Sequence, residues 1–276
     1  SEASRSFYKV PRELREPRSL LGLVEGLFVT SGEWLSKLFG HLGLKGKVKV
    51  DMKPLGSFYS TTHLYRLKSE GAEVKVVVKR FLDFWSIKWL LVSIVARPAR
   101  NFGIKPSTRM GNEYTATIEL RKAGIGTPKI LLVHSKEKLI VKEFVDGVPS
   151  TNFLRKDEVR SIAKALASIH KMGYAVGDTK PDNILFKDGK VYFIDLEQAE
   201  KGGDPVWDVA EFIYYSCWFL PDARSVKEMA ERFAEAYDYD RSVLKKAASE
   251  KYALPFRSVA EDDLLSAAKR ALKSTP

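Results

Sequence analysis

The sequence predicts an α+β protein in which a small sheet-rich part precedes a larger helical part. Between residues 48 and 144, apolar and polar residues alternate in short runs, which is the period of half-buried strands. After Asp146-Gly147, apolar residues recur every three or four positions, as on one face of a helix. We therefore expect an N-terminal arm and helical extension over residues 1–49, a first lobe over 50–145 and a second lobe over 146–276.

The extension begins with a polar segment, residues 1–18, which carries charges of both signs and two prolines and is expected to be an arm. Residues 19–44 predict two short amphipathic helices interrupted at Thr30-Ser31-Gly32. Ser31 is suited to cap the second helix. One face of that helix carries Trp34, Leu35, Leu38 and Phe39.

In the first lobe, alternation predicts strands at 48–52, 64–67, 73–81, 129–134 and 138–144. Two of these pairs form hairpins, one around Ser69-Glu70-Gly71 and one around Ser135-Lys136-Glu137. A helix is expected between the hairpins, at residues 111–123, because Gly124 ends its periodic pattern.

In the second lobe, a helix over 156–172 leads into a loop over 173–183 that is rich in Gly, Asp and Pro. Two apolar runs, 184–186 and 191–195, flank a turn at Lys187-Asp188-Gly189 and predict a further hairpin. The remaining helices are expected at 206–219, 225–238, 241–252 and 259–273.

Composition narrows the class of protein. The 276 residues are 45% hydrophobic and 29% charged, which excludes wholesale disorder. The single cysteine, Cys217, excludes an internal disulfide framework and a cysteine metal cluster, so we expect a reducing, cytoplasmic location. The net charge of +11 favours polyanionic partners, such as a nucleotide, a nucleic acid or ribonucleoprotein, or an anionic membrane surface.

The strongest apolar run, residues 81–96, is interrupted by Asp83 and Lys88 and falls short of the roughly 18–20 apolar residues of a spanning helix. It is an insertion in the first lobe. It either lies on a membrane surface or a partner, or packs against residues 19–44, and we expect the packed arrangement.

The segments 176–186 and 191–195 contain the side chains best suited to catalysis and metal binding. Asp178, Asn183 and Asp195 place three oxygen-bearing side chains near one another in this pattern. Asn183 and Asp195 suit Mg²⁺, which prefers oxygen ligands. Asp178 then remains to deprotonate a hydroxyl nucleophile. The alternative is that all three are ordinary turn-forming residues.

Two residues of the first lobe extend the pattern. Lys79 ends an otherwise apolar strand and can pair with phosphates, or it can be an edge lysine that blocks aggregation. Glu113 opens the expected helix and can pair with Lys79, or it can simply favour the helix N-terminus. Glu119 is a rival partner, but it lies about 240° around the helix, so only one of the two can face the lysine.

This order of a strand lysine, a helix glutamate, D-x-x-x-x-N and a later aspartate resembles the protein-kinase-like superfamily. DTKPDNIL (178–185) is similar to the kinase catalytic loop, FIDLEQA (193–199) occupies the D-F-G position, and KEFVDGVPS (142–150) resembles the hinge. The resemblance implies a two-lobed kinase-like fold, with a small antiparallel-sheet lobe and a helical lobe, that uses ATP and Mg²⁺. In it Lys79 holds the phosphates and Glu113 positions Lys79.

The resemblance also assigns the remaining site residues. Asp178 is the catalytic base, and Lys180 neutralises the transferred phosphate. Asn183 and Asp195 hold the metal. The nucleotide-binding set is completed by backbone groups of Glu143 and Val145 at the adenine, and by Gly56, Ser57 and Thr61 in the phosphate loop.

Departures from the pattern point to atypical kinases. The phosphate loop over 55–67 keeps only Gly56, Val176 replaces the histidine of H-R-D, and the short segment from Asp195 to Asp208 has no A-P-E motif. These features resemble the RIO family, the kinase of the KEOPS complex and lipopolysaccharide-core kinases. GGDPVWDVAEF (202–212) instead resembles aminoglycoside and choline phosphotransferases, where Asp208 would brace the catalytic loop.

Three functions therefore stay open. The first is an atypical serine/threonine protein kinase, favoured by Lys180 in DTKPDN. The second is a kinase of a small molecule or lipid-sugar, favoured by the segment around Asp208. The third is an ATPase or pseudokinase within a complex, favoured by the basic charge and the glycine-poor loop.

Overall fold

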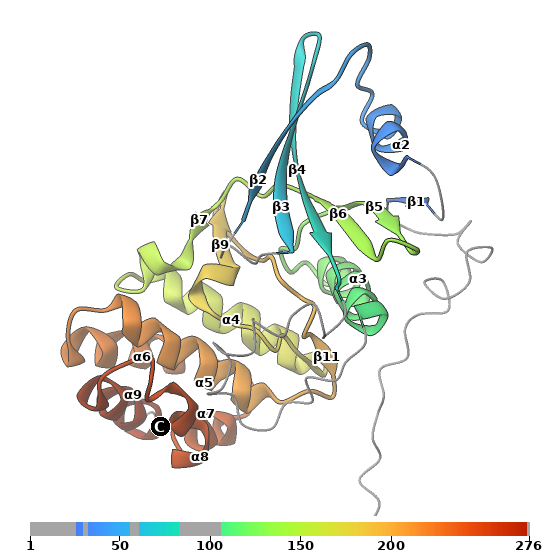
Figure 1. Cartoon of the computed structure of the whole chain (residues 1–276). Helices are drawn as coiled ribbons and strands as arrows, with labels where there is room; N and C mark the ends of the chain where they lie inside the picture. The colour runs from blue at the N-terminus through green and yellow to red at the C-terminus, as the bar shows by residue number, and fades with distance from the viewer. Residues whose placement is uncertain (1–25, 30–32, 56–60, 83–105, 275–276) are drawn as a thin grey trace, which may run out of the picture. The chain divides into compact units, whose positions relative to one another are not determined.

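The computed structural model describes residues 26–29, 33–55, 61–82 and 106–274 (Figure 1). These residues divide into two compact units, with a boundary between Val145 and Asp146 and with residues 120–127 assigned to the second unit. The expected arm, Gly56 and Ser57 of the phosphate loop, and most of the apolar run over 81–96 lie outside the described residues. No helix in the part of the chain that is described is long and apolar enough to cross a membrane.

The first unit is built on a six-stranded sheet with the order β1-β5-β6-β4-β3-β2. Its strands are β1 (Leu27–Val29), β2 (Lys49–Pro54), β3 (Thr62–Ser69), β4 (Ala72–Arg80), β5 (Ile130–His134) and β6 (Leu139–Glu143). Neighbouring strands are antiparallel, except that β1 runs parallel to β5. The β3–β4 turn places Gly71 at φ +77°, a conformation that glycine adopts without strain.

Each face of this sheet buries an apolar cluster. Helix α2 (Trp34–His41) contributes Trp34 and Leu38 to one cluster, together with Tyr65 and Leu67 of β3. Helix α3 (Pro106–Lys122) contributes to the other cluster, whose buried members are Phe81, Met110, Tyr114, Ile130, Val133 and Ile140. Residues on the α3 face of β4 and β6 are therefore shielded from water by a helix.

The part of the first expected helix that the structure describes is not helical. Residues 27–29, which the sequence placed in the first of two short helices, form strand β1 instead. The strand exists because Leu27 and Val29 lie opposite Leu132 and His134 of β5, so pairing with a distant strand overrides the local helical pattern. The second short helix is present as α2.

The second unit is mainly helical. Its helices are α4 (Glu158–Lys171), α5 (Pro205–Ser216), α6 (Ala223–Ala236), α7 (Arg241–Ala247), α8 (Glu250–Ala253) and α9 (Asp262–Ser274), with 3-10 turns η4 (Ser150–Phe153), η5 (Pro181–Asn183), η6 (Cys217–Phe219) and η7 (Leu254–Phe256). The helix expected over 241–252 is divided in two, because Ser249 adopts an extended conformation at the residue before α8.

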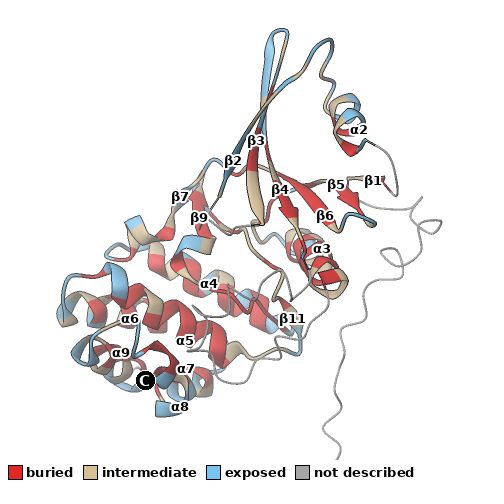
Figure 2. Ribbon diagram, viewed as in Figure 1, coloured by how far each residue is buried: buried red, intermediate tan, exposed pale blue. Residues whose placement is uncertain are grey.

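Short strands complete the second unit. The hairpin of β9 (Ile184–Lys187) and β10 (Lys190–Phe193) pairs with β7 (Val148–Pro149), and β8 (Tyr174–Ala175) pairs with β11 (Glu200–Lys201). Ten residues of helix α5 are buried. Figure 2 shows this helix mostly in the colour of buried residues. The ring of Phe212 in α5 stacks on the ring of Phe233 in α6, and the two ring centres are 5.3 Å apart.

Candidate active site

Lys79 and Glu113 meet inside the first unit. The Lys79 ammonium lies 3.0 Å from a Glu113 carboxylate oxygen, and their side chains are 5% and 0% exposed. Lys79 lies on β4 and Glu113 on α3, whose first residue is Pro106, so the carboxylate stands two turns inside the helix. Glu113 is therefore too far from the helix N-terminus to be stabilised by the helix dipole. Its buried negative charge is instead stabilised by the ion pair with Lys79.

A second lysine shares the same carboxylate. Lys142 of β6 is buried and its ammonium contacts the other Glu113 oxygen. Pairing of β4 with β6 sets Val77 opposite Lys142 and Lys79 opposite Ile140, so both lysines point to the α3 face as diagonal neighbours. Glu113, and not Glu119, thus lies at the centre of this charged cluster.

The other proposed nucleotide contacts of the first unit border the same sheet. Thr61 directly precedes β3, and its carbonyl accepts the backbone N–H of Arg80 at 2.9 Å. Glu143 ends β6, and its carboxylate accepts the Lys129 N–H at 3.0 Å. Val145 follows and is 6% exposed. The sequence segment resembling a hinge therefore begins where β6 ends.

Asp178 and Lys180 lie together in the second unit, on the loop between β8 and η5. The Lys180 ammonium lies 3.1 Å from the Asp178 carboxylate. Asp178 is 8% exposed, and the amide of Gln198 approaches it at 3.5 Å. A nearly buried carboxylate beside an ammonium can accept a proton from a hydroxyl while the ammonium stabilises developing negative charge.

Asn183 and Asp195 lie at the open end of the β9–β10 hairpin. Ile184 lies opposite Phe193, and the next pair outward is joined by a hydrogen bond of 3.1 Å from the Ile194 N–H to the Asn183 carbonyl. Both side chains are partly exposed. One amide oxygen and one carboxylate at a hairpin end are donors that Mg²⁺ accepts, with water and phosphate oxygens completing its shell.

Two buried carboxylates of α5 hold the backbone around Asp178. Asp208 accepts the N–H groups of Val176 and Gly177 at 2.6 and 2.7 Å, and Glu211 accepts the N–H of Thr179 at 2.8 Å. Both carboxylates are 0% exposed, so their charges depend on these bonds. The loop is fixed immediately before and after Asp178 by one helix.

A histidine and a tyrosine extend this clamp. His170 of α4 lies 3.0 Å from Asp208 through one ring nitrogen and 2.6 Å from the Tyr237 hydroxyl through the other. Burial raises the pKa of Tyr237, with a further contribution from Asp208, so the phenol stays protonated. The His170 side chain reaches the backbone of Val176 and Gly177 through Asp208.

Two of these buried residues, Lys142 and Glu211, were not among the site residues predicted from the sequence. Lys142 interrupts the apolar run KLIVKEF just as Lys79 interrupts VVVKRF. This shared pattern could have indicated that Lys142 is buried beside Lys79. Glu211 lies three residues after Asp208, on the same side of an otherwise apolar helix. A charged residue within a buried element indicates a buried partner.

Known proteins are similar to the part of the chain that carries most of these site residues. The RIO domain family matches residues 106–213, from the first residue of α3 into α5. The KEOPS complex subunit Bud32 of Pyrococcus abyssi is 27% identical over 149 residues, which are 49% of this chain and 67% of that protein.

A second relative is the probable serine/threonine-protein kinase BUD32 homolog of Archaeoglobus fulgidus. It is 33% identical over 79 residues, or 29% of this chain and 40% of the relative, so less than half the length of that protein is matched.

Among solved structures, the microcompartment-associated aminopropanol kinase superposes with a TM-score of 0.51 at 10% identity, over 87% of this chain and 93% of that one. This likeness concerns the fold alone, and it agrees with a sheet-rich unit followed by a helical unit. The family match adds the segment that carries Glu113, Asp178 and Asp195. These matches support the resemblance of the chain to atypical proteins of the protein-kinase-like superfamily.

Proposed function

We propose that this protein transfers the γ-phosphate of ATP to a serine or threonine hydroxyl of another protein. The observation that carries the proposal is the loop of Asp178: the base candidate is 8% exposed, contacts Lys180 at 3.1 Å and is held on both sides by buried carboxylates. Fixed geometry of this kind is the main source of rate in phosphoryl transfer.

In the proposed reaction, the acceptor oxygen attacks the γ-phosphorus while Asp178 takes the hydroxyl proton. The bond from the γ-phosphorus to the β,γ-bridging oxygen breaks, and ADP leaves with that oxygen. Lys180 neutralises charge on the transferred group. Lys79, oriented by Glu113, holds the other phosphates.

Further contacts would complete the nucleotide site. Backbone groups of Glu143 and Val145 would bind the adenine, and Gly56, Ser57 and Thr61 would border the phosphates. Asn183 and Asp195 would hold Mg²⁺, whose charge offsets that of the phosphate oxygens when it is bound. Their oxygen donors at one hairpin end fit that ion.

Two other functions have specific support. The segment from Asp195 to Asp208 is short and carries GGDPVWD, which favours a small-molecule acceptor. The matched relatives include a KEOPS complex subunit, which favours an ATPase or pseudokinase that works with partner proteins. The net charge of +11 is compatible with a nucleic-acid or ribonucleoprotein partner.

The destination of labelled phosphate separates the three functions. The purified chain is incubated with γ-labelled ATP, Mg²⁺, a generic protein acceptor and a cell extract. Label on serine or threonine supports the proposal. Label only on small soluble or lipid-extractable products supports the second function. Labelled inorganic phosphate alone, with ATP bound, supports the third, and either of these last two results overturns the proposal.

A further inference from the structure

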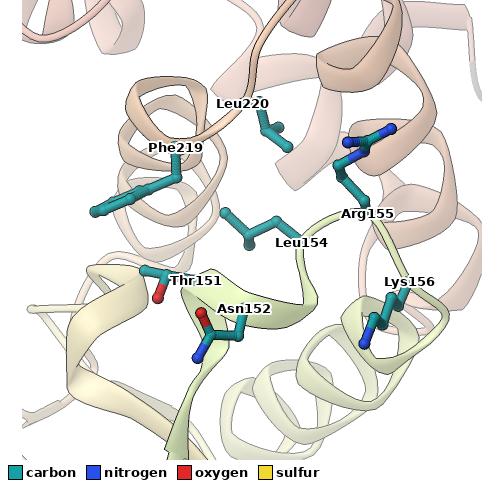
Figure 3. Close-up of a pocket in the computed structure, with 7 residues that line it drawn as sticks. All are labelled: Thr151, Asn152, Leu154, Arg155, Lys156, Phe219 and Leu220. Carbon is teal, nitrogen blue, oxygen red and sulfur yellow. The ribbon is translucent and has the colours of Figure 1, made fainter.

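Two neighbouring hollows open on the second unit, and Phe219 forms a wall of both. The first measures about 320 Å³ and is lined by Lys180, Pro181, Asp182, Tyr215, Trp218, Phe219, Ser258 and Val259. The second measures about 390 Å³ and is lined by Thr151, Asn152, Leu154, Arg155, Lys156, Phe219 and Leu220 (Figure 3). We call the two hollows together the acceptor groove.

Large aromatic side chains are exposed along the acceptor groove. Trp218 is 68% exposed and Phe219 is 39% exposed, both on η6 at the end of α5. A neighbouring tryptophan and phenylalanine that lie this open to water indicate a surface that is covered by a partner, because exposed aromatic clusters are uncommon on monomers. Tryptophan is also the residue type most enriched at binding hot spots.

One end of the acceptor groove adjoins the proposed base. Lys180, which lines the first hollow, contacts Asp178 at 3.1 Å and lies 5.6 Å from the centre of the Tyr215 ring. The other end is fixed to the same loop, since the Ser150 hydroxyl donates to the Pro181 carbonyl at 2.8 Å. Both ends of the groove are therefore attached to the loop that carries Asp178.

Charge around the acceptor groove is mainly positive. Its lining carries three cations, Arg155, Lys156 and Lys180, and one anion, Asp182. Lys180 is paired with Asp178, and the pKa of Asp222, which does not line the groove, is lowered by hydrogen bonds from Ser225 and also by the charge of Arg155. The lining of the second hollow carries Arg155 and Lys156, which Figure 3 shows beside Leu154, and no carboxylate. An acidic group of the ligand complements that end.

We propose that the acceptor groove binds the phosphate acceptor as an extended polypeptide with its serine or threonine at Lys180, a large apolar side chain in the first hollow and an acidic side chain at Arg155 and Lys156. This inference rests on the proposed function. Two hollows with a common wall suit successive side chains of an extended chain, whereas a compact small molecule fills one hollow.

The test is phosphorylation of a positional peptide library by the full chain. We expect preference for a large apolar and an acidic residue at fixed distances from the acceptor. Trp218→Ala should lower kcat/KM for the preferred peptide roughly 30-fold with an unchanged KM for ATP, as for loss of a binding hot spot. Met52→Ala, which truncates a residue that is 65% exposed on the first unit, is the matched control.

Charge reversal tests the acidic position. R155E/K156E should abolish the preference for acidic residues, while K164E/K273E, an equal change of charge at exposed helix positions, should keep it. Preference for basic peptides, or equal loss in both double variants, overturns the groove assignment. So does transfer of label to small molecules alone.

A binding measurement separates failure of the groove from failure of the proposed function. The probe is a synthetic peptide with one serine, flanking leucines and an acidic end, and its match has glutamine in place of the acids. Because the chain has five tryptophans, the fluorescence of Trp218 is obtained as the difference between the wild-type chain and Trp218→Phe. Saturable quenching by the acidic peptide, lost in R155E/K156E, supports the groove even where no phosphate is transferred. Absence of quenching by the acidic peptide overturns it.

Discussion

Among single residues, Glu113 provides the negative charge for two buried lysines on the sheet face that α3 covers. It contacts both Lys79 and Lys142, and all three side chains are at most 5% exposed. Charges in such surroundings are stable only when opposite charges accompany them, because burial removes their hydration. Loss of Glu113 therefore affects the folding of the first unit as well as the placement of Lys79.

Glu113→Gln keeps the side-chain size but removes the charge that both lysines contact. We expect the free energy of unfolding to fall by about 3–5 kcal/mol, the range seen when one partner of a buried ion pair is removed. Urea denaturation measures the change. Glu119→Gln, on the same helix, should cause a smaller loss, and equal stability of Glu113→Gln and the wild-type chain would contradict the assignment.

The reactivity of Cys217 reports whether the end of α5 is buried. It is 1% exposed, and burial raises the pKa of its thiol to about 12. Because the pKa is raised, the thiol stays protonated and unreactive below that pH. Iodoacetamide at pH 8 should leave the native chain unmodified and label it once in urea, as read by mass spectrometry. Rapid labelling of the native chain would show that this helix end is open.

At the scale of elements, α5 supports the proposed catalytic loop. Its N-terminus is capped by Asp204, whose side chain accepts the Val206 N–H at 2.9 Å, and its middle supplies Asp208 and Glu211 to the loop. A helix buried along most of its length is a stiff support. Helix α5 therefore holds the backbone on both sides of Asp178.

Asp208→Asn replaces a charged acceptor by an amide that cannot accept from both backbone N–H groups. Hydrogen bonds to charged groups contribute about 1.5–3 kcal/mol, so we expect kcat to fall roughly 10- to 100-fold with little change in the KM for ATP. Asp204→Ala is the control, since loss of a helix cap lowers stability by about 1 kcal/mol but leaves the loop bonds in place. Equal kcat in Asp208→Asn and Asp204→Ala would refute the clamp.

Elements with strong local signals were predictable from the sequence. The valine alternation and the turn at Ser69-Glu70-Gly71 identify β3 and β4, and Lys79 is conspicuous among the valines. Features that depend on distant partners were not. Residues 27–29 become a strand only because β5 lies beside them, and Lys142 pairs with a glutamate 29 residues earlier. Local pattern does not contain such pairings.

At the scale of the whole molecule, two units bring different parts of the proposed chemistry. The first holds Lys79, Glu113, Glu143 and Val145, and the second holds Asp178, Lys180, Asn183 and Asp195. Lys79 contacts Glu113 within the first unit, and Asp178 contacts Lys180 within the second. We propose that these residues serve phosphoryl transfer, with Asp178 as the base.

The most direct measurement of that claim is the rate of γ-phosphate transfer by Asp178→Asn. Asp188→Asn is the matched control, because Asp188 lies in an exposed turn at φ +49°, a conformation that asparagine also adopts. General-base removal predicts a loss of at least about 100-fold in kcat with native melting and unchanged ATP binding. The control should keep the wild-type rate. A wild-type rate in Asp178→Asn would contradict the assignment of the base and with it the proposed mechanism.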